Sequence, residues 1–235
     1  MIQSKKSFRL VTFIAIILMG FTYAKAQHND FKIDDSLYTY YMQVSNNLKN
    51  KDVGLQMTDT LFDRATRIND VKAQCIALYL RVTYYHLQNE YENERKEFHR
   101  ISPFILKTPY TQYYFGAWVT IITEDINKGK HIDALNNLNE MLDKAQKMKN
   151  DYGVMRSYEL LGDMYFNINI FKFAIVQYSK ALEYGKDKKI SDLSSIYIKL
   201  GRANLFLRRW KDGEDAILAC IQRNQDERAN IIPYT

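Results

Sequence analysis

A pattern of large aromatic and small side chains recurs at regular spacing along this chain of 235 residues. Its clearest copy combines large and small residues at helical spacing: Tyr158, Leu161, Gly162, Tyr165, Ala174, Tyr178 and Ala181. Glycine inside a helix costs about 1 kcal/mol relative to alanine, so Gly162 is expected at a point where no side chain fits. The small residues Gly162, Ala174 and Ala181 therefore predict close contacts between antiparallel helices.

Further copies of this pattern lie on both sides of the clearest one. The following copy contains Tyr197, Leu200, Gly201 and Gly213. The preceding copies start at Trp118, Ala77 and Tyr38, and Ala134 takes the place of Ala174. The step between copies is thus about 40 residues, within the range of roughly 20 to 50 residues that is typical of solenoid proteins. With only 9 glycines and 3 prolines, the chain also lacks the many turn residues of an all-β protein.

In residue types and spacing, the pattern resembles the tetratricopeptide repeat (TPR), which has a large aromatic residue, Leu-Gly and Tyr in one helix and small–aromatic–small in the next. The resemblance implies an all-α fold, a right-handed α-solenoid of about five TPR-like helix-turn-helix units with a period of about 40 residues. This solenoid spans residues 34–224, and its predicted units are about 35–69, 70–108, 109–150, 151–190 and 191–224. Residues 27–33 are a lead-in, and residues 225–235 start a further helix or a tail.

The period is longer than the usual ~34 residues of this repeat. Because polar, turn-like stretches at 145–153 and 184–192 lie between units, we expect longer second helices or looser connections there. Ser102-Pro103 and Thr108-Pro109 each place a hydroxyl side chain before proline, a combination that favours the first turn of a helix. These pairs predict helix starts and a short extra helical turn between the second and third units.

The first 26 residues have the layout of a secretory signal peptide. Lys5, Lys6 and Arg9 precede an uncharged apolar run over 10–24, and Ala24-Lys25-Ala26 offers small residues for cleavage before Gln27. We therefore predict export to the periplasm or outer surface of a bacterium. An uncleaved anchor is the alternative, although a membrane span needs roughly 18 or more apolar residues. Residues 1–26 carry four of the six net positive charges, which removes the main argument for nucleic-acid binding.

The sequence contains none of the familiar patterns of catalytic and metal sites. It has no Gly-rich phosphate loop, no G-x-S-x-G elbow and no H-E-x-x-H motif. The histidines are scattered without ligand spacing: His28, His86, His99 and His131. Cys75 and Cys220 both lie in apolar patterns, so two buried thiols are expected, with a disulfide as the alternative in an oxidising compartment. We therefore predict no enzymatic activity and no bound metal or cofactor.

In TPR arrays the first helix of each unit lines a concave surface, where ligands usually lie. The resemblance and the spacing together predict partner-binding residues on this surface: Gln43, Asn47, Val82, His86, Thr123, Asn127, Asp163, Asn167, Arg202 and Phe206. Asn47, Asn127 and Asn167 are equivalent in three units, where they either bind a peptide backbone or end helices before turns. The 18 tyrosines and 12 phenylalanines likewise either pack neighbouring helices or form a groove for peptide side chains or sugars.

The resemblance implies that the chain binds a protein or peptide partner. A signal segment followed by a TPR array is similar to the exported input region of bacterial TPR-containing membrane regulators and sensor kinases, which implies a sensing role. The alternative is a freestanding periplasmic or surface adaptor that assembles a complex, or a glycan-binding repeat protein. An enzyme is disfavoured because no site is found. We expect no nucleic-acid partner, and membrane contact only through an uncleaved signal segment.

Overall fold

The computed structural model describes residues 33–188, 190 and 193–229. All regular secondary structure in this part of the chain is α-helical. Its helices are α2 (Asp35–Asn47), α3 (Gly54–Arg67), α4 (Val71–Leu87), α5 (Tyr91–Ile105), α6 (Gln112–Asn127), α7 (His131–Lys147), α8 (Asp151–Asn167), α9 (Phe171–Asp187), α10 (Ser194–Phe206) and α11 (Trp210–Ala229). The all-α prediction is therefore confirmed. The predicted signal segment 1–26 and residues 27–32 of the lead-in lie outside the described residues.

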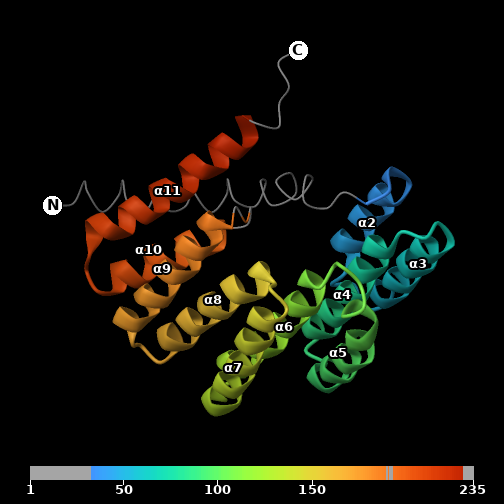
Figure 1. Cartoon of the computed structure of the whole chain (residues 1–235), viewed down its shortest axis with the longest axis horizontal. Coiled ribbons are helices and arrows are strands. Elements are labelled where there is room, and N and C mark those ends of the chain that lie inside the picture. The colour runs from blue at the N-terminus through green and yellow to red at the C-terminus, as the bar shows by residue number, and fades with distance from the viewer. Residues whose placement is uncertain (1–32, 189, 191–192, 230–235) are drawn as a thin grey trace.

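Consecutive helices pack as pairs, from α2–α3 at one end of the molecule to α10–α11 at the other (Figure 1). The first helices α4, α6, α8 and α10 contact one another in that order, and each second helix also packs against the first helix of the next unit. The buried core therefore continues from unit to unit, with α8 contributing side chains to both halves of it. None of the helices in the described residues combines the length and apolarity needed to cross a membrane.

The unusually long period results from the length of the helices, because the links between them are short. Helices α8 and α9 have 17 residues each, and links of three residues separate α6, α7, α8 and α9 from one another. The extra length is thus shared by both helices of a unit, whereas we expected it in the second helices or the connections. The last helix continues without a break to Ala229, so residues 225–229 belong to the fifth unit and do not start a further helix.

Six of the links share one backbone geometry. They are 68–70, 88–90, 128–130, 148–150, 168–170 and 207–209, and the middle residue of each has a positive φ between 53° and 71°. The N–H of the third residue donates to a carbonyl five residues earlier, as from Asn150 to Ala145 at 2.8 Å. This is the Schellman motif that ends helices, and glycine and asparagine adopt its left-handed residue most easily. Four of the six middle residues are Asn or Gly, so the sequence itself encodes most of these helix ends.

The link at 148–150 leads to a first prediction, because Lys149 holds the left-handed conformation with φ 53°. This conformation costs a residue with a Cβ about 1–2 kcal/mol. Glycine avoids that cost, but it also makes the unfolded chain more flexible, which offsets part of the gain. We expect Lys149→Gly to raise the free energy of unfolding by about 0.5 kcal/mol, measured by urea denaturation. Gly129→Ala, at φ 71°, is the reverse change and should lower it. A loss of stability in Lys149→Gly would contradict the argument.

Gly162 lies at a close contact between α8 and α9 in the fourth unit. A Cβ at this position would lie 2.5 Å from Cδ1 of Tyr178, whose side chain is almost completely buried. In the fifth unit, Gly201 and Gly213 face each other, and a Cβ on either would lie 3.2 Å from the carbonyl oxygen of the other. The helices of both units therefore touch at positions where the sequence has glycine.

The two proline-containing pairs between the second and third units do not start helices, and that prediction is wrong. Pro103 lies inside α5, in its last turn, where a missing N–H costs a single hydrogen bond to the carbonyl of His99. The Ser102 hydroxyl donates to the carbonyl of Phe98 within the same helix. Thr108 lies in the connection 106–111, and α6 begins only at Gln112. The predicted extra turn of helix is thus the end of α5.

The two cysteines lie far apart, in α4 and α11, and both are buried and free of a disulfide. Cys75 Sγ lies 3.5 Å from the hydroxyl of Thr108. Cys220 Sγ donates to the carbonyl of Ser194, at 3.6 Å. Each thiol therefore packs as a small apolar group between helices.

Candidate binding surfaces

Four of the predicted partner-binding residues come together where α8 and α10 lie side by side. Asp163 and Asn167 on α8 are equivalent to Arg202 and Phe206 on α10, because each pair occupies the last turn of its helix. Thr123 and Asn127 hold the same positions on α6, and Gln43 is an exposed residue of α2. The residues predicted on α6, α8 and α10 therefore occupy equivalent positions on three consecutive first helices, and their part in partner binding stays a prediction.

The second unit differs from the prediction by one residue. Val82 is completely buried in the core, so it cannot contact a partner. The last residue of α4 is Leu87, which makes Thr83 and Leu87 the equivalents of Thr123 and Asn127. Val82 instead corresponds to Gly162, a packing position, and its assignment to the binding surface is corrected.

The three equivalent asparagines each stand as the last residue of a first helix. Asn47 Nδ2 donates to the carbonyl of Gln43 at 2.9 Å, within its own helix. Asn167 Nδ2 donates to the carbonyl of Ile126 at 3.3 Å, which connects the end of α8 to the end of α6. Asn127 is exposed. Of the two interpretations, the geometry of Asn47 and Asn167 favours helix ends and contacts between units over a ladder open to a peptide.

His86 joins the second unit to the third through a buried carboxylate. Its Nδ1 lies 3.2 Å from Glu94, which has no exposed surface and also accepts a hydrogen bond from the Thr120 hydroxyl at 2.6 Å. The hydrogen bond to Glu94 raises the pKa of the His86 imidazole above its ordinary value, against the opposing effect of burial. His86 therefore has a structural partner in α5.

This raised pKa predicts how stability depends on pH. The contribution of protonated His86 is fully present below its unfolded pKa, near 6.5, and is lost as the pH rises through the folded value. We expect His86→Gln to lower the free energy of unfolding by about 1 kcal/mol at about pH 5.5, and by clearly less at about pH 8.5. Urea denaturation at both pH values measures the difference. His99→Gln, at an exposed position of α5, is the control, and an equal pH effect in both variants would contradict the prediction.

A cluster of charged side chains connects α8 to α10. Glu159, which is fully buried, accepts a hydrogen bond from Lys199 at 2.5 Å and is paired with Arg156. Lys199 also lies 2.7 Å from Asp163, which accepts a hydrogen bond from the Tyr178 hydroxyl at 2.8 Å. Burial alone would raise the pKa of Glu159, but Arg156 and Lys199 hold it below its ordinary value. Burial does raise the pKa of Asp163, despite Lys199. These charges bind one another and hold the fourth and fifth units together.

Aromatic side chains gather at the ends of the same helices. The rings of Phe171 and Phe206 stack at 4.8 Å, and Phe166 lies edge-on to both, at 5.2 and 5.3 Å. The Arg202 guanidinium lies 5.2 Å from the centre of the Phe166 ring. Phe206 is 59% exposed, and Trp210, four residues later across the link 207–209, is 61% exposed. We call Phe166, Phe171, Phe206 and Trp210 the aromatic edge.

Of the aromatic edge, only Phe206 is among the partner-binding residues predicted from the sequence. The other three flank the links 168–170 and 207–209, where an aromatic residue is needed neither by the repeat pattern nor by the turn. That position beside a link is the sequence signal that could have identified them.

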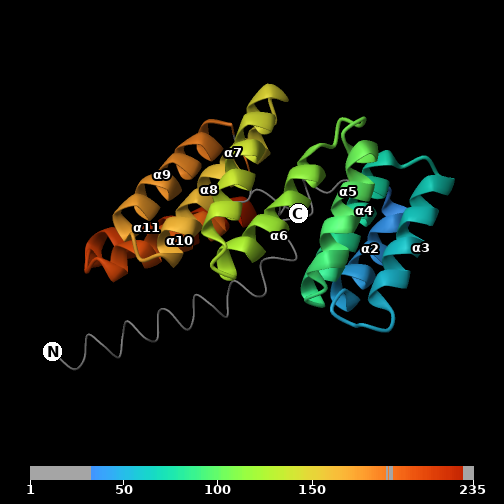
Figure 2. The same cartoon turned by 90° about the horizontal axis from the view of Figure 1, so that it is seen from below.

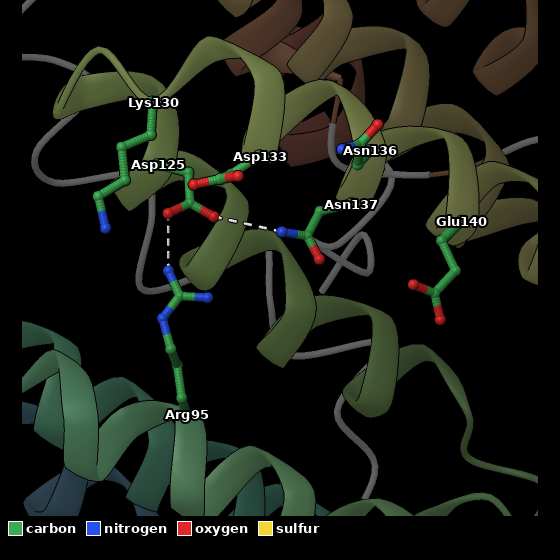
Figure 3. A pocket seen from close by; sticks show the side chains of 7 residues that line it. All are labelled: Arg95, Asp125, Lys130, Asp133, Asn136, Asn137 and Glu140. Atoms are coloured by element: carbon green, nitrogen blue, oxygen red, sulfur yellow. Dashed lines mark hydrogen bonds and ion pairs between the residues drawn. The ribbon is translucent and has the colours of Figure 1, made fainter.

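A pocket of about 240 Å³ lies between α5 and α7, over α6 (Figure 3). Arg95 of α5 reaches Asp125 of α6 at 2.7 Å, and Asn137 of α7 donates to the same carboxylate at 3.3 Å. Burial raises the pKa of Asp125 above its ordinary value, although Arg95 opposes the shift. Asp133 and Glu140 line the α7 side. Figure 2 shows α6 between α5 and α7, which explains why all three helices supply side chains.

An adjoining pocket of about 290 Å³ has an aromatic floor. Phe98, Tyr114 and Trp118 pack together with ring centres 5.2 to 5.9 Å apart, and the Lys144 ammonium lies 4.7 Å from the centre of the Tyr114 ring. Each of the three rings is buried, with at most 6% of the residue exposed. These aromatic residues pack helices together, whereas Phe206 and Trp210 of the aromatic edge are exposed to solvent. The packing interpretation of the aromatic content thus holds for the third unit, and ligand binding by exposed rings stays a prediction.

Among the residues that the structure describes, no group of three His, Cys, Asp or Glu side chains is placed to hold a metal ion. Arg95 and Asp125 in the first pocket pair with each other, as do Glu159 and Lys199 in the cluster between α8 and α10.

Comparison with known proteins supports the fold. No family model matches the chain, and no curated protein matches it. Among solved structures, the chain is similar to BtubC (BKLC) from P. vanneervenii, with a TM-score of 0.52 and 16% identity over 94% of this chain and 91% of that one. A kinesin light chain candidate from Podosopora anserina with nearly identical TPR-like repeats gives a TM-score of 0.45 and 8% identity, over 87% of this chain and 100% of that one. The stacked helix pairs of the described residues and the likeness to BtubC together give the chain the fold of a TPR-like, all-helical solenoid.

Proposed function

We propose that this chain is a scaffold that binds a protein partner through the surface of its fourth and fifth units. The observation that carries the proposal is the aromatic edge, where Phe206 and Trp210 leave more than half of their area in water on a rigid pair of helices. Large aromatic side chains next to arginine are typical of the residues that dominate protein–protein binding energy. Exposed apolar patches of this kind commonly mark interaction sites.

Binding fits the chemistry of the chain better than catalysis does. Asp125 has a raised pKa and lines a pocket, which are two features of catalytic carboxyl groups. Its two oxygens, however, accept hydrogen bonds from Arg95 and Asn137, so the carboxylate has a structural role in connecting α5, α6 and α7. The TPR-like fold also favours a non-enzymatic role, by analogy only.

Export and a sensing role are further parts of the proposal, and they rest on the sequence. The layout of residues 1–26 supports export to the periplasm or outer surface, and the likeness to the input regions of membrane regulators supports sensing. A freestanding adaptor is the second candidate. The intact mass of the native product, measured separately in soluble and membrane fractions of source cells, distinguishes them. A soluble species that begins at Gln27 and ends at Thr235 supports the adaptor, and a much larger membrane-bound species supports the sensor.

Crosslinking in source cells tests the binding function itself. The tagged full chain is compared with Phe206→Ser/Trp210→Ser and with Ile132→Ser, which changes an isolated apolar residue of α7 that is 79% exposed. We expect the same crosslinked protein with the unchanged chain and with Ile132→Ser, and its loss with the double variant. A crosslinked protein that persists in the double variant would contradict the proposed surface. The absence of any specific crosslinked protein would contradict the function.

A further inference from the structure

The two segments that form the aromatic edge contain no acidic residue. Residues 164–182 contain Lys172 and Lys180, and residues 193–211 contain Lys199, Arg202, Arg208, Arg209 and Lys211, with no Asp or Glu in either range. The second range, with five cations, is more basic than the chain as a whole, which has 33 basic and 27 acidic residues, and the acidic residues Asp163, Glu183, Asp192 and Asp212 border the two ranges. An uneven distribution of this kind creates a local positive potential that attracts an acidic partner.

Most of these cations are exposed and available. Lys199 is bound to Glu159 and Asp163, and Lys180 lies 6.0 Å from the Tyr158 ring. The other five side chains are exposed: Lys172, Arg202, Arg208, Arg209 and Lys211. Among the side chains that the structure describes, no carboxylate forms an ion pair with any of these five. These five cations lie next to the residues of the aromatic edge in the sequence, and they have no ion-pair partner among the described side chains.

The rings at the centre of this surface are already held in place. Phe206 stacks on Phe171 at an interplanar angle of 17°, Phe166 packs against both, and Arg202 lies over Phe166. The links that carry the edge have only three residues and are closed by hydrogen bonds, as from Ile170 to Tyr165 at 2.8 Å. A preorganised surface loses little conformational freedom when a partner binds.

We infer that the aromatic edge binds an acidic segment of the partner protein, one that carries at least one large apolar side chain among Asp and Glu residues. The apolar side chain would pack on Phe206 and Trp210, and the carboxylates would pair with the arginines, of which Arg202 and Arg208 flank the rings. This inference rests on the proposed scaffold function and adds the chemistry of the partner. Arginine forks bind carboxylates with two parallel hydrogen bonds, which adds specificity to the charge attraction.

An anionic membrane is the other occupant that basic and aromatic residues attract. Insertion into a membrane requires apolar side chains that extend beyond the surface of the protein. At this edge the Phe166, Phe171 and Phe206 rings pack against one another, and the two short links keep them close to the helices. The geometry therefore favours a peptide that lies across the rings, and vesicle binding becomes an outcome of the test.

Selection from a random phage library of peptides of about 12 residues tests the inference. The full chain is compared with Phe206→Ser/Trp210→Ser, with Arg202→Gln/Arg208→Gln/Arg209→Gln, and with a control that removes three exposed charges elsewhere, Lys49→Gln/Lys96→Gln/Lys107→Gln. We expect the unchanged chain and the lysine control to select peptides rich in Asp, Glu and large apolar residues. Neither of the other two variants should enrich them. A selected peptide should bind the arginine variant at least about ten-fold more weakly, and should weaken with added NaCl.

The outcomes separate the inference from the function on which it rests. Peptides that lack acidic residues but still require Phe206 and Trp210 would overturn the inference and leave the scaffold function intact. Acidic peptides that bind the arginine variant as tightly as the unchanged chain would also overturn it. If no peptide is selected and the chain instead binds vesicles that contain phosphatidylglycerol, in a manner that requires Phe206 and Trp210, both proposals fail.

Discussion

Replacing Gly162 with isoleucine is expected to lower the free energy of unfolding by about 3 kcal/mol, at the upper end of the usual cost of overpacking. A Cβ at this position already falls 2.5 Å from Cδ1 of Tyr178, and isoleucine adds three more carbons. The Tyr178 ring is almost fully buried, and its hydroxyl donates to Asp163, so it cannot swing away without breaking that bond. Urea denaturation of the full chain measures the loss.

The third unit provides a matched control, because a different pair of side chains fills the equivalent contact between its two helices. Ile122 and Leu138 are equivalent there to Gly162 and Tyr178, and both are buried. Gly162→Ile/Tyr178→Leu transfers this pair into the fourth unit. We expect the double variant to lose less stability than Gly162→Ile and Tyr178→Leu lose when their separate losses are added, by more than about 1 kcal/mol. Additive losses would mean that the two residues do not share one space, and would count against the repeat register.

The sequence reveals the repeat because close helix packing restricts residue size at fixed positions. Gly162 and Gly201 are one period apart and lie at the same contact in consecutive units. The register is lost in the second unit, where the equivalent residue is Val82 and no glycine marks the contact. From the sequence alone, a valine can be assigned either to the buried core or to the binding surface. This ambiguity explains why the predicted binding positions in the second unit, Val82 and His86, are wrong by one residue.

Features that depend on neighbouring units were harder to predict. Pro103 follows a hydroxyl residue, as at a helix start, but it lies in the last turn of α5, where proline costs little. The exposure of Phe206 and Trp210 depends on what packs beside them, which composition does not record. Glu159 and Lys199 are also one period apart in the sequence, and only the stacking of α8 on α10 brings them together. Sequence therefore predicts the contacts within a unit better than those between units.

Replacing Glu159 with glutamine is expected to lower the free energy of unfolding by about 3 kcal/mol near pH 7, the lower end of the cost of removing one partner from a buried ion pair. Glu159 has no exposed surface, and it is the shared partner of Arg156 and Lys199. Glutamine keeps the shape of the side chain but leaves both cations without that negative charge. Urea denaturation of the full chain measures the loss, and Asp143→Asn is the control. Asp143 pairs with Lys147 in water, where such a pair contributes about 0.5 kcal/mol or less.

The pH dependence of this loss separates the charge of Glu159 from its shape. Because Arg156 and Lys199 hold its folded pKa below the unfolded value near 4.5, its contribution is present above that value and disappears as the pH falls through the folded one. The difference between the unchanged chain and Glu159→Gln should therefore shrink below about pH 4.5. If the difference in the free energy of unfolding stays constant down to low pH, glutamine destabilises the chain through poorer packing and not through the lost charge. A loss no larger than that of Asp143→Asn near pH 7 would mean that the fourth and fifth units are held together by their apolar core alone.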